Sequence, residues 1–315
     1  MRVFLTGASG FVGGAAVPAF RAAGHEVLAM ARSEASAAKV RALGATPVAC
    51  SLGSVPPEAL AGIDVVVHAA AYVEEWGTRE QFWEANVTGT QQLLDAARAA
   101  GVGRFVHVSS EAVLFAGEDL IDVDESAPYP TRHRYLYSES KAEAERRVRA
   151  AQAPGFATLV LRPRLVWGPG DATVLPALRR MVAEGGYFWL DGGRRPTSTV
   201  HIQNVAHALT LALTRGQPGG VYFIADDCTT TIREFLSAYA AQGGVALPDR
   251  SLPGWLARGA AAAREGLWRL VGAKRPPPMT AFPVAMMSRT ITVRTDRAKA
   301  ELGYVPVIRR EEGLA

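Results

Sequence analysis

Cysteine is scarce in this chain of 315 residues, because Cys50 and Cys228 are its only two. They stand far apart and lack the spacing of metal ligands, so the sequence offers neither a disulfide framework nor a zinc site. Long apolar runs are also missing: no stretch of about 18 or more apolar residues is free of charge, which predicts no membrane-spanning helix. The opening residues, MRVFLTG, are too short an apolar run for a signal peptide. We therefore expect a cytoplasmic protein without a bound metal.

Lysine is rare as well, and arginine supplies nearly all of the positive charge. The formal net charge is only +4, and the basic residues are spread along the chain. A nucleic-acid-binding protein normally gathers its basic residues into one patch. We expect no nucleic-acid partner.

Short apolar runs alternate with helical patterns through the first half of the chain. The predicted strands are 3–5, 25–30, 47–50, 63–68, 104–109, 158–162 and 221–225, and the predicted helices are 11–23, 35–43, 82–100, 138–151 and 232–241. Continuous Val/Ile/Leu strands separated by helices indicate a parallel sheet that is covered on both faces. The predicted fold class is therefore α/β, a doubly wound parallel Rossmann sheet with a smaller mixed α/β substrate lobe.

Turn-rich sequence after residue 165 suggests where that lobe begins. We assign 1–165 to the dinucleotide-binding domain, with 200–225 returning to it. The segments 166–199 and 226–315 form the predicted substrate-binding lobe.

Residues 254–273 form a basic amphipathic helical pattern that contains Trp255. Two interpretations remain open. The segment is typical of a helix that lies on a membrane surface, which would make the membrane a peripheral partner. Its many alanines and glycines favour the other interpretation, a helix that packs on the second lobe or covers a pocket. A homodimer is a further partner that the sequence leaves open.

A glycine-rich loop follows the first strand directly. Its segment runs from Thr6 through Ser9, Phe11 and Val12, and its glycines are Gly7, Gly10 and Gly13. The first glycine permits a tight turn, the second lets the backbone approach a pyrophosphate, and the third lets the helix pack near the strand. The helix N-terminus then offers free N–H groups to the phosphates. This pattern predicts a dinucleotide site.

The end of the second strand indicates which dinucleotide binds. An NAD-binding chain usually places Asp or Glu there to hold the ribose 2′-hydroxyl, whereas this chain has Ala31 and then Arg32. An arginine can pair with a 2′-phosphate, although Arg32 can also be an ordinary surface arginine. We therefore favour NADP(H) and keep NAD(H) as the alternative.

Tyr137 and Lys141 are four residues apart, on one face of the predicted helix 138–151. A tyrosine that exchanges a proton with an alcohol or ketone oxygen needs a pKa below its usual value near 10. A neighbouring ammonium group favours the phenolate and lowers that pKa. Ser110 ends the preceding strand, where its hydroxyl can bind the same oxygen. We predict Ser110, Tyr137 and Lys141 as the catalytic set.

With these motifs in this order, the chain resembles the extended short-chain dehydrogenases/reductases, the NAD(P)-dependent epimerase/dehydratase superfamily. The segments 71–77, 161–171 and 198–209 look most like the 3β-hydroxysteroid dehydrogenase family. The resemblance implies a cofactor site that also includes Ser51, Leu52, Ala69, Ala70, Ala71, Asn86, Pro163 and Val166. It implies a substrate site with Trp76, Glu111, Trp167, Tyr187 and Thr199, although packing in the core or a lid would explain these large side chains equally well.

Three features depart from the family's pattern. Ser51 stands where relatives often place an Asp that contacts adenine, and Ala31 replaces the carboxylate that selects NAD. The printed sequence stops where relatives usually continue into a helix, so we expect a shortened terminus.

The resemblance implies an oxidoreductase that moves a hydride between a nicotinamide and a secondary alcohol or ketone of a bulky apolar substrate, such as a steroid or a long-chain keto acid. A nucleotide-sugar epimerase or dehydratase is the alternative, but Ala112 stands where dehydratases carry a second acid. A non-catalytic dinucleotide sensor is the third hypothesis, and the intact Tyr137 and Lys141 pair argues against it.

Overall fold

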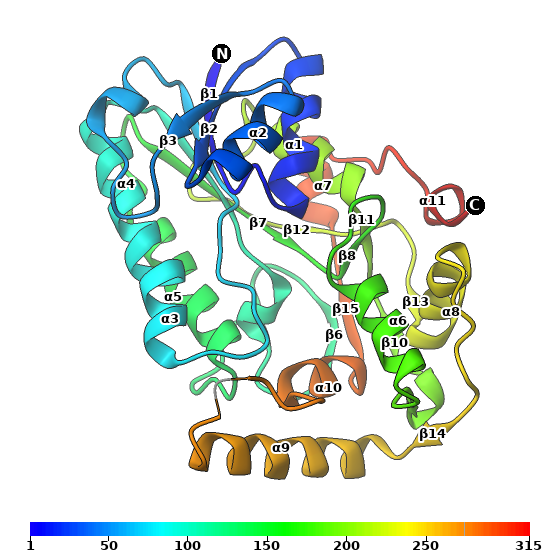
Figure 1. Ribbon diagram of the computed structural model, residues 1–315. Coiled ribbons are helices and arrows are strands. Elements are labelled where there is room, and N and C mark those ends of the chain that lie inside the picture. The colour runs from blue at the N-terminus through cyan, green and yellow to red at the C-terminus, as the bar shows by residue number, and fades with distance from the viewer. Residues whose placement is uncertain (274) are drawn as a thin grey trace.

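Seven short apolar strands form one parallel sheet in the computed structural model, which describes residues 1–273 and 275–315 (Figure 1). The strands are β1 (Arg2–Thr6), β2 (Glu26–Ala31), β3 (Thr46–Ala49), β4 (Val65–His68), β5 (Arg104–Val108), β7 (Ala157–Pro163) and β12 (Val221–Ile224). Their order across the sheet is β12-β7-β5-β4-β1-β2-β3, and every neighbouring pair is parallel. Strands β2 and β3 are thus added on one side of β1, and the later strands are added on the other side, beginning with β4. The order of the strands therefore reverses between β1 and β4, and parallel sheets of this kind bind ligands at that point.

Helices cover both faces of this sheet because side chains alternate along each strand. On β1, Val3 and Leu5 point to the face that carries α1 and α7, whereas Phe4 points to the face that carries α4 and α5. The helices are α1 (Phe11–Ala22), α2 (Glu34–Ala42), α3 (Arg79–Trp83), α4 (Gly89–Ala99), α5 (Leu136–Ala150), α6 (Val174–Ala183), α7 (Ile202–Ala212), α8 (Ile232–Gln242), α9 (Gly254–Leu270), α10 (Ala281–Met287) and α11 (Arg310–Leu314). The predicted doubly wound α/β fold with a smaller mixed lobe is confirmed.

The predicted helix 82–100 is interrupted. It consists of α3, a π-helical turn at Glu84–Thr88 and then α4. Isolated π turns often occur at functional sites because they shift a side chain out of helical register. Here the turn carries Asn86, one of the predicted cofactor-site residues.

A second, four-stranded sheet forms the centre of the substrate lobe, in the order β13-β10-β15-β6. Its strands are β6 (Leu120–Val123), β10 (Pro196–Thr197), β13 (Thr230–Thr231) and β15 (Ile291–Val293). Two further strand pairs are β8 (Val166–Trp167) with β11 (Val200–His201), and β9 (Trp189–Leu190) with β14 (Ser251–Leu252). None of the helices in the described ranges is long and apolar enough to cross a membrane.

The chain passes between the two parts more often than the predicted boundaries suggest. β6 comes from the first 165 residues but pairs in the lobe sheet. Conversely, Ala298, Leu302 and Tyr304 near the end of the chain pack in the core beneath the large sheet. The lobe is therefore built from segments that leave and return to the Rossmann part.

Asp226, which follows β12, joins the two parts. Its Oδ1 accepts hydrogen bonds from the backbone N of His201 (3.0 Å) and Nδ2 of Asn204 (2.8 Å). Its Oδ2 accepts from Nε1 of Trp167 (3.2 Å) and Oγ1 of Thr199 (2.9 Å). One buried carboxylate thus accepts four hydrogen bonds and holds the segments at the start of the lobe against the end of β12.

Candidate active site

The glycine-rich loop has the geometry that a phosphate needs. Gly7 has a φ of +77°, and a Cβ there would lie 2.7 Å from the backbone of Ala69 and Ala70, so only glycine fits. Gly10 caps α1 without a side-chain hydrogen bond, and the first turn contains no acidic residue. The backbone N–H groups of the first turn are therefore free to bind a pyrophosphate, and the positive end of the helix dipole favours it. The loop fits a dinucleotide.

Arg32 lies directly after β2, at the carboxyl edge of the sheet, and is exposed. The nearest acid, Glu34, is engaged elsewhere, because Nη1 of Arg41 donates to it at 2.7 Å. Ser33 caps α2 through Ser36. In the described part of the chain, therefore, no carboxylate next to Arg32 is placed to hold a ribose 2′-hydroxyl.

Asn86 holds the loop that follows β4, where Ala69, Ala70 and Ala71 lie. Its Oδ1 accepts from the backbone N of Tyr72 (2.6 Å), and its Nδ2 donates to the carbonyl of Tyr72 (3.1 Å) and to Oγ of Ser140 on α5 (3.0 Å). Asn86 therefore ties the loop after β4 to the helix that carries Tyr137.

The remaining predicted cofactor residues surround the same edge of the sheet. Ser51 follows β3 and shares a hydrogen bond with Ser54 (2.8 Å), and the side chain of Leu52 packs against Gly89. Pro163 ends β7, and Val166 begins β8. Each lies at the end of a strand or just beyond it.

Tyr137 and Lys141 both lie on α5, one turn apart, as the spacing predicts. Lys141 is buried, and its Nζ donates to the carbonyl of Val108 at 2.7 Å. Burial lowers the pKa of Lys141 to about 8, and Glu145 opposes that shift. The lysine is therefore held beside the end of β5, where Ser110 follows.

A buried ion pair lies beside Ser110. Oγ of Ser110 donates to Oε2 of Glu111 (2.6 Å), and Nη1 of Arg164 donates to Oε1 of the same carboxylate (2.9 Å). Arg164 also donates from Nη2 to Oγ1 of Thr197 (3.0 Å). Glu111, predicted as a wall of the substrate pocket, is almost completely buried and occupied by these two donors. The hydroxyl proton of Ser110 points at Glu111, so Ser110 can donate to a substrate oxygen only by leaving that carboxylate.

The pKa of Tyr137 lies above its ordinary value, mainly because burial disfavours the phenolate and then because of the negative charge of Glu111. The neighbouring Ser110 hydroxyl acts in the opposite direction. The sequence predicts that Lys141 lowers this pKa, whereas in the structure its ammonium donates to the carbonyl of Val108. The phenol form of Tyr137 is therefore favoured, and a positive charge close to its oxygen would make it a stronger acid.

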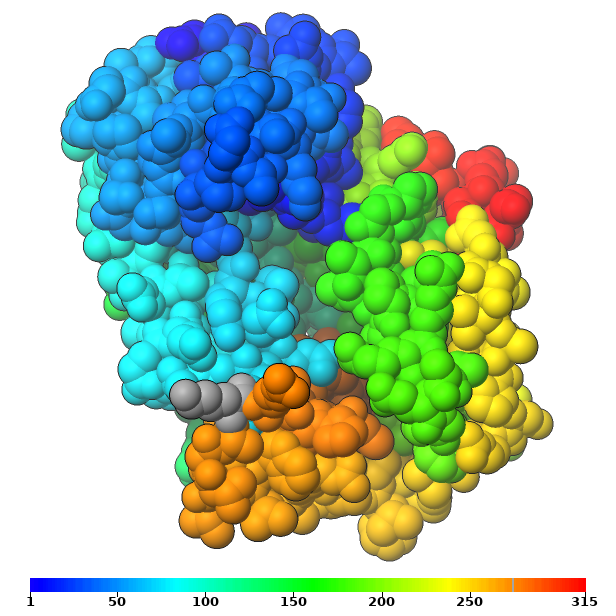
Figure 2. Space-filling model, viewed as in Figure 1, coloured from blue at the N-terminus to red at the C-terminus, as the bar shows by residue number. Residues whose placement is uncertain are grey.

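Aromatic side chains form an apolar wall next to Tyr137. Phe282 of α10 lies 5.5 Å from the Tyr137 ring and 5.3 Å from the Tyr135 ring, centroid to centroid. The Tyr135 ring stacks on Phe115 at 5.7 Å. Figure 2 shows the molecule hollowed between the cyan segment about α3, the green segment about α6 and the orange segment about α10. Tyr137 and Ser110 both keep part of their surface exposed, whereas Lys141 and Glu111 do not.

Three residues predicted as substrate contacts have structural roles instead. Trp167 is completely buried and packs edge-on against Phe235 and Tyr239. Tyr187 packs against Trp189 in the same cluster, and Thr199 is buried against Asp226. Large aromatic residues near a turn-rich segment can pack in a core or line a pocket. In this structure Trp167 and Tyr187 pack in the core.

Trp76 lies at the margin of the molecule and contacts the segment after α9. Its Nε1 donates to the carbonyl of Ala273 at 3.2 Å, and the guanidinium of Arg269 lies 4.5 Å from its ring. The structure therefore places Trp76 against α9, the helix predicted to cover the lobe or lie on a membrane.

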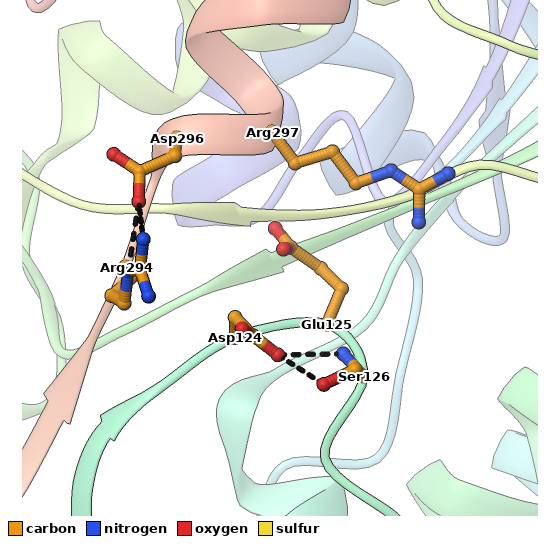
Figure 3. A pocket seen from close by; sticks show the side chains of 6 residues that line it. All are labelled: Asp124, Glu125, Ser126, Arg294, Asp296 and Arg297. Carbon is orange, nitrogen blue, oxygen red and sulfur yellow. Dashed lines mark hydrogen bonds and ion pairs between the residues drawn. The ribbon is translucent and has the colours of Figure 1, made fainter.

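A small polar pocket lies away from this set, between the segment after β6 and the segment after β15 (Figure 3). Asp124 accepts from Ser126, Asp296 pairs with Arg294 at 2.6 Å, and Glu125 accepts from the backbone N of Phe223 at 2.7 Å. These three carboxylates therefore already have hydrogen-bond or ion-pair partners within the protein. Nowhere in 1–273 or 275–315 do three His, Cys, Asp or Glu side chains converge as metal ligands.

A family model described as the NAD dependent epimerase/dehydratase family matches residues 3–225, which include the phosphate loop, Ser110, Tyr137 and Lys141. The chain belongs to this family.

Two relatives within the epimerase/dehydratase family show its chemistry. The 4-hydroxy-2-methyl-3-oxo-4-farnesyl-3,4-dihydroquinoline-1-oxide ketoreductase of Stigmatella aurantiaca is 41% identical over 316 residues, covering 100% of this chain and 95% of the relative. The 3-beta-hydroxysteroid dehydrogenase of Mycolicibacterium neoaurum is 31% identical, covering 100% and 89%. By their names both relatives are oxidoreductases, and this chain is an NAD(P)-dependent oxidoreductase, as the resemblance implies.

A solved structure of MoeE5 in complex with UDP-glucuronic acid and NAD supports the same fold. It superposes with a TM-score of 0.74 and 24% identity, covering 100% of this chain and 96% of that chain.

Sequence reasoning missed several side chains of this epimerase/dehydratase site. Arg164 and Phe282 carry no motif, because their partners are far away in sequence. His68, at the end of β4, shares hydrogen bonds with Thr6 (2.7 Å) and Thr90 (2.9 Å), and burial lowers its pKa to about 3. A histidine that ends a buried strand is a weak signal that could have drawn attention to it.

Proposed function

We propose that this protein is an NADP(H)-preferring ketoreductase that acts on a bulky apolar ketone. The observation that carries the proposal is the placement of Tyr137, one helical turn from Lys141 and beside an aromatic wall, with Ser110 partly exposed at the end of the preceding strand. A protonated phenol serves carbonyl reduction, in which the ketone oxygen must gain a proton.

Each residue has a role in that reaction. When bound, the reduced nicotinamide cofactor supplies the hydride that the carbonyl carbon accepts. Tyr137 donates its proton to the carbonyl oxygen, so the ketone becomes a secondary alcohol and the phenol becomes a phenolate. Lys141 holds the positive charge that favours this phenolate once it forms, and Asn86 holds α5 and the loop after β4 in place.

The partly exposed rings of Tyr135 and Phe282, next to Tyr137, support an apolar substrate. A ketone with a large hydrocarbon part would bury that surface, which favours binding. The ketoreductase and steroid dehydrogenase relatives act, by their names, on molecules of this kind.

Turnover of ketones with NADPH tests the proposal. A steroid ketone, a long-chain 3-keto acid and a prenylated aromatic ketone form the panel, and oxidation of NADPH is followed with each. We expect at least one to be reduced, and Tyr137→Phe to lower kcat by about 10²–10⁴-fold because the proton donor is lost. Tyr135→Phe is the matched control and keeps most activity. Turnover of nucleotide sugars without net oxidation of NADPH would overturn the proposal in favour of an epimerase.

The preference for NADP(H) has a separate test. We expect NADPH to bind at least tenfold more tightly than NADH, and Arg32→Ala to remove that difference, about 1.4 kcal/mol. Arg41→Ala is the control, because Arg41 lies on the same surface but pairs with Glu34. Equal binding of NADH and NADPH by the unaltered protein would contradict the preference and leave the ketoreductase proposal standing.

We also place the protein in the cytoplasm. Cys50 and Cys228 are both free thiols, as a reducing compartment would leave them.

A further inference from the structure

Helix α9 runs along one margin of the molecule, at the bottom of Figure 1, and packs on the protein through small residues. Gly254, Ala257 and Ala261 are its buried residues, and they contact Val284 of α10 and Met279. The helix therefore contacts the protein mainly through small side chains, and most of its large apolar side chains lie on its other sides.

Those large side chains point outward. Trp255, Leu256, Leu267, Leu270 and Val271 are all exposed, with Trp255 at 69% and Leu270 at 83%. At 100° per residue, the side opposite the buried residues carries these five and the alanines and glycines between them, with no charged residue. We call this surface the α9 outer face. A surface helix normally carries polar residues there, so the usual pattern is reversed.

Positive charge lies along the edges of the α9 outer face. Arg264 is exposed at one edge and Arg269 at the other. The single acid of the helix, Glu265, is occupied, because Nη2 of Arg269 donates to it at 2.9 Å and the backbone N of Ala281 donates to it at 3.0 Å. The exposed Arg264 thus gives the α9 outer face a positive edge next to its apolar surface, whereas Arg269 at the other edge is paired with the helix's one carboxylate.

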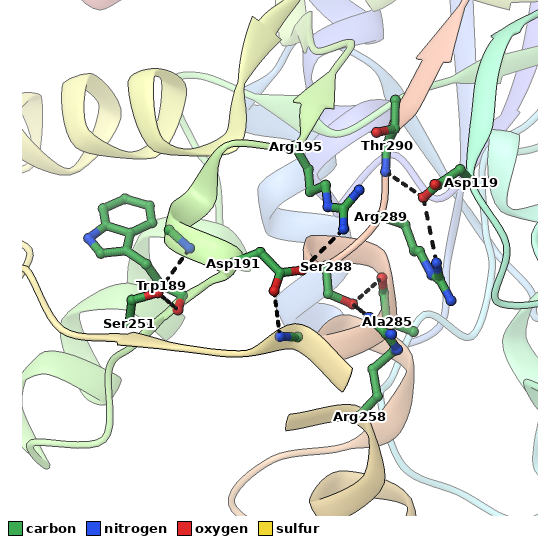
Figure 4. Close-up of polar contacts among 12 residues, drawn as sticks. Asp119, Trp189, Asp191, Arg195, Ser251, Arg258, Ala285, Ser288, Arg289 and Thr290 are labelled. Atoms are coloured by element: carbon green, nitrogen blue, oxygen red, sulfur yellow. Dashed lines mark hydrogen bonds and ion pairs between the residues drawn. The ribbon is translucent and has the colours of Figure 1, made fainter. Parts of the chain in front are cut away.

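Both ends of α9 are tied down with this face outward. At the first turn, Asp191 accepts from the backbone N of Gly254 (2.8 Å), and Arg258 donates to Oγ of Ser288 (3.0 Å), as Figure 4 shows. Beyond the last turn, Trp76 binds the carbonyl of Ala273, and its ring contacts Arg269. The helix is therefore held on the lobe with its outer face exposed in the described structure.

We propose that the α9 outer face docks on the surface of a lipid bilayer that contains anionic headgroups. Apolar side chains of a helix lying in the interface enter the acyl region, tryptophan favours the interface, and arginines at the margin reach the headgroups. A second copy of this chain fits less well, because a twofold contact through α9 would bring the two Arg264 side chains to the same surface without a free carboxylate of the helix to oppose them. The proposal does not depend on the ketoreductase assignment.

Co-sedimentation of the full chain with vesicles tests this docking. We expect binding to vesicles of phosphatidylglycerol and phosphatidylcholine, at least tenfold weaker binding to phosphatidylcholine alone, and loss of binding at high salt. The double variant L267E/L270E should bind at least tenfold more weakly than the unaltered chain. Ile121→Glu is the matched control, because Ile121 is also exposed (64%) but lies on β6, and it should bind normally.

Two results would overturn the proposal: no binding of the unaltered chain to anionic vesicles, or equal loss of binding in Ile121→Glu. Circular dichroism and the fluorescence of bound NADPH show that each variant is folded. Sedimentation velocity without vesicles identifies the competing occupant, since a dimer that L267E/L270E dissociates, together with no vesicle binding, would assign the face to a second copy.

Discussion

Two buried ion pairs lie two residues apart at the end of β7 and differ in what surrounds their carboxylates. Glu145 accepts from Nη2 of Arg162 (2.5 Å), from Ser109 (2.5 Å) and from Tyr129 (2.7 Å), and none of these donors belongs to the predicted catalytic set. Glu111 accepts from Arg164 and from Ser110, and both Glu111 and Ser110 influence the pKa of Tyr137. The first pair joins β7 to α5, whereas the second acts on the proton of Tyr137.

The comparison teaches that burial alone does not tell a structural ion pair from one that tunes catalysis. Both pairs are equally hidden, and both carboxylates are fully engaged. The two pairs differ in one respect: Ser110, which donates to Glu111, also lies near the reacting Tyr137, whereas no donor to Glu145 belongs to the predicted catalytic set. Removing each pair should therefore change different measurements.

Glu145→Ala should produce the largest change. It leaves Arg162 buried without its partner, so we expect the free energy of unfolding to fall by about 3–5 kcal/mol. Chemical denaturation measures this loss. Glu143→Ala is the control on the same helix, because Glu143 pairs with Arg147 (3.2 Å) at the surface and should cost less than about 1 kcal/mol. Similar losses in both variants would remove the distinction between buried and exposed pairs.

Glu111→Gln should have a smaller effect on stability, about 1–3 kcal/mol, because glutamine keeps its size and an acceptor oxygen. Its larger effect is on pH dependence. The charge of Glu111 raises the pKa of Tyr137, so Glu111→Gln should lower that pKa. Reduction needs the protonated phenol. The rate of reduction should therefore fall off at a lower pH than in the unaltered enzyme. The rise of alcohol oxidation, which needs the phenolate, should move to lower pH as well.

Profiles of kcat/KM against pH in both directions measure these shifts. Glu139→Gln serves as the control, since Glu139 lies on α5 near Tyr137 but pairs with Arg79 at 2.7 Å. An unmoved midpoint, or one that moves to higher pH, would show that Glu111 is only structural.

Thr197→Val should produce the smallest change, about 0.5–1.5 kcal/mol in unfolding free energy. It removes the hydroxyl that accepts from Nη2 of Arg164 and so loosens the cation that neutralises Glu111. The midpoint for reduction should then stay or move slightly to higher pH, opposite to Glu111→Gln. A downward shift like that of Glu111→Gln would contradict the assigned roles.

The features of the fold and site that the sequence predicts correctly are those encoded by residues close together along the chain. Gly13 is required by close backbone contacts with Gly7 and Ala8 in the same strand–loop–helix unit, and the four-residue spacing of Tyr137 and Lys141 follows from the helix. The alternation of strands and helices likewise predicts the parallel sheet. Each of these features depends on neighbours along the chain.

The other features depend on contacts that no local pattern encodes. Glu111 meets Arg164 from 53 positions away, and Trp167 meets Asp226 from 59 positions away. An aromatic or charged residue in a turn-rich segment looks the same before folding, whether it will line a pocket or fill a core. The sequence therefore predicts Trp167 and Glu111 as pocket walls, whereas the structure places one in the core and the other in an ion pair.

The position of β15 between β10 and β6 has a consequence for how the chain folds as it is synthesised. β6 pairs with no strand other than β15 among those that the structure describes, and the hydrogen bond from Asp122 to Thr292 spans 170 residues. The edge of β6 therefore remains unpaired, long after the first five strands of the large sheet have been synthesised, until residues 291–293 follow. Completion of the lobe beside Tyr137 is thus a late step, and chaperones that shield exposed strand edges would act in that interval.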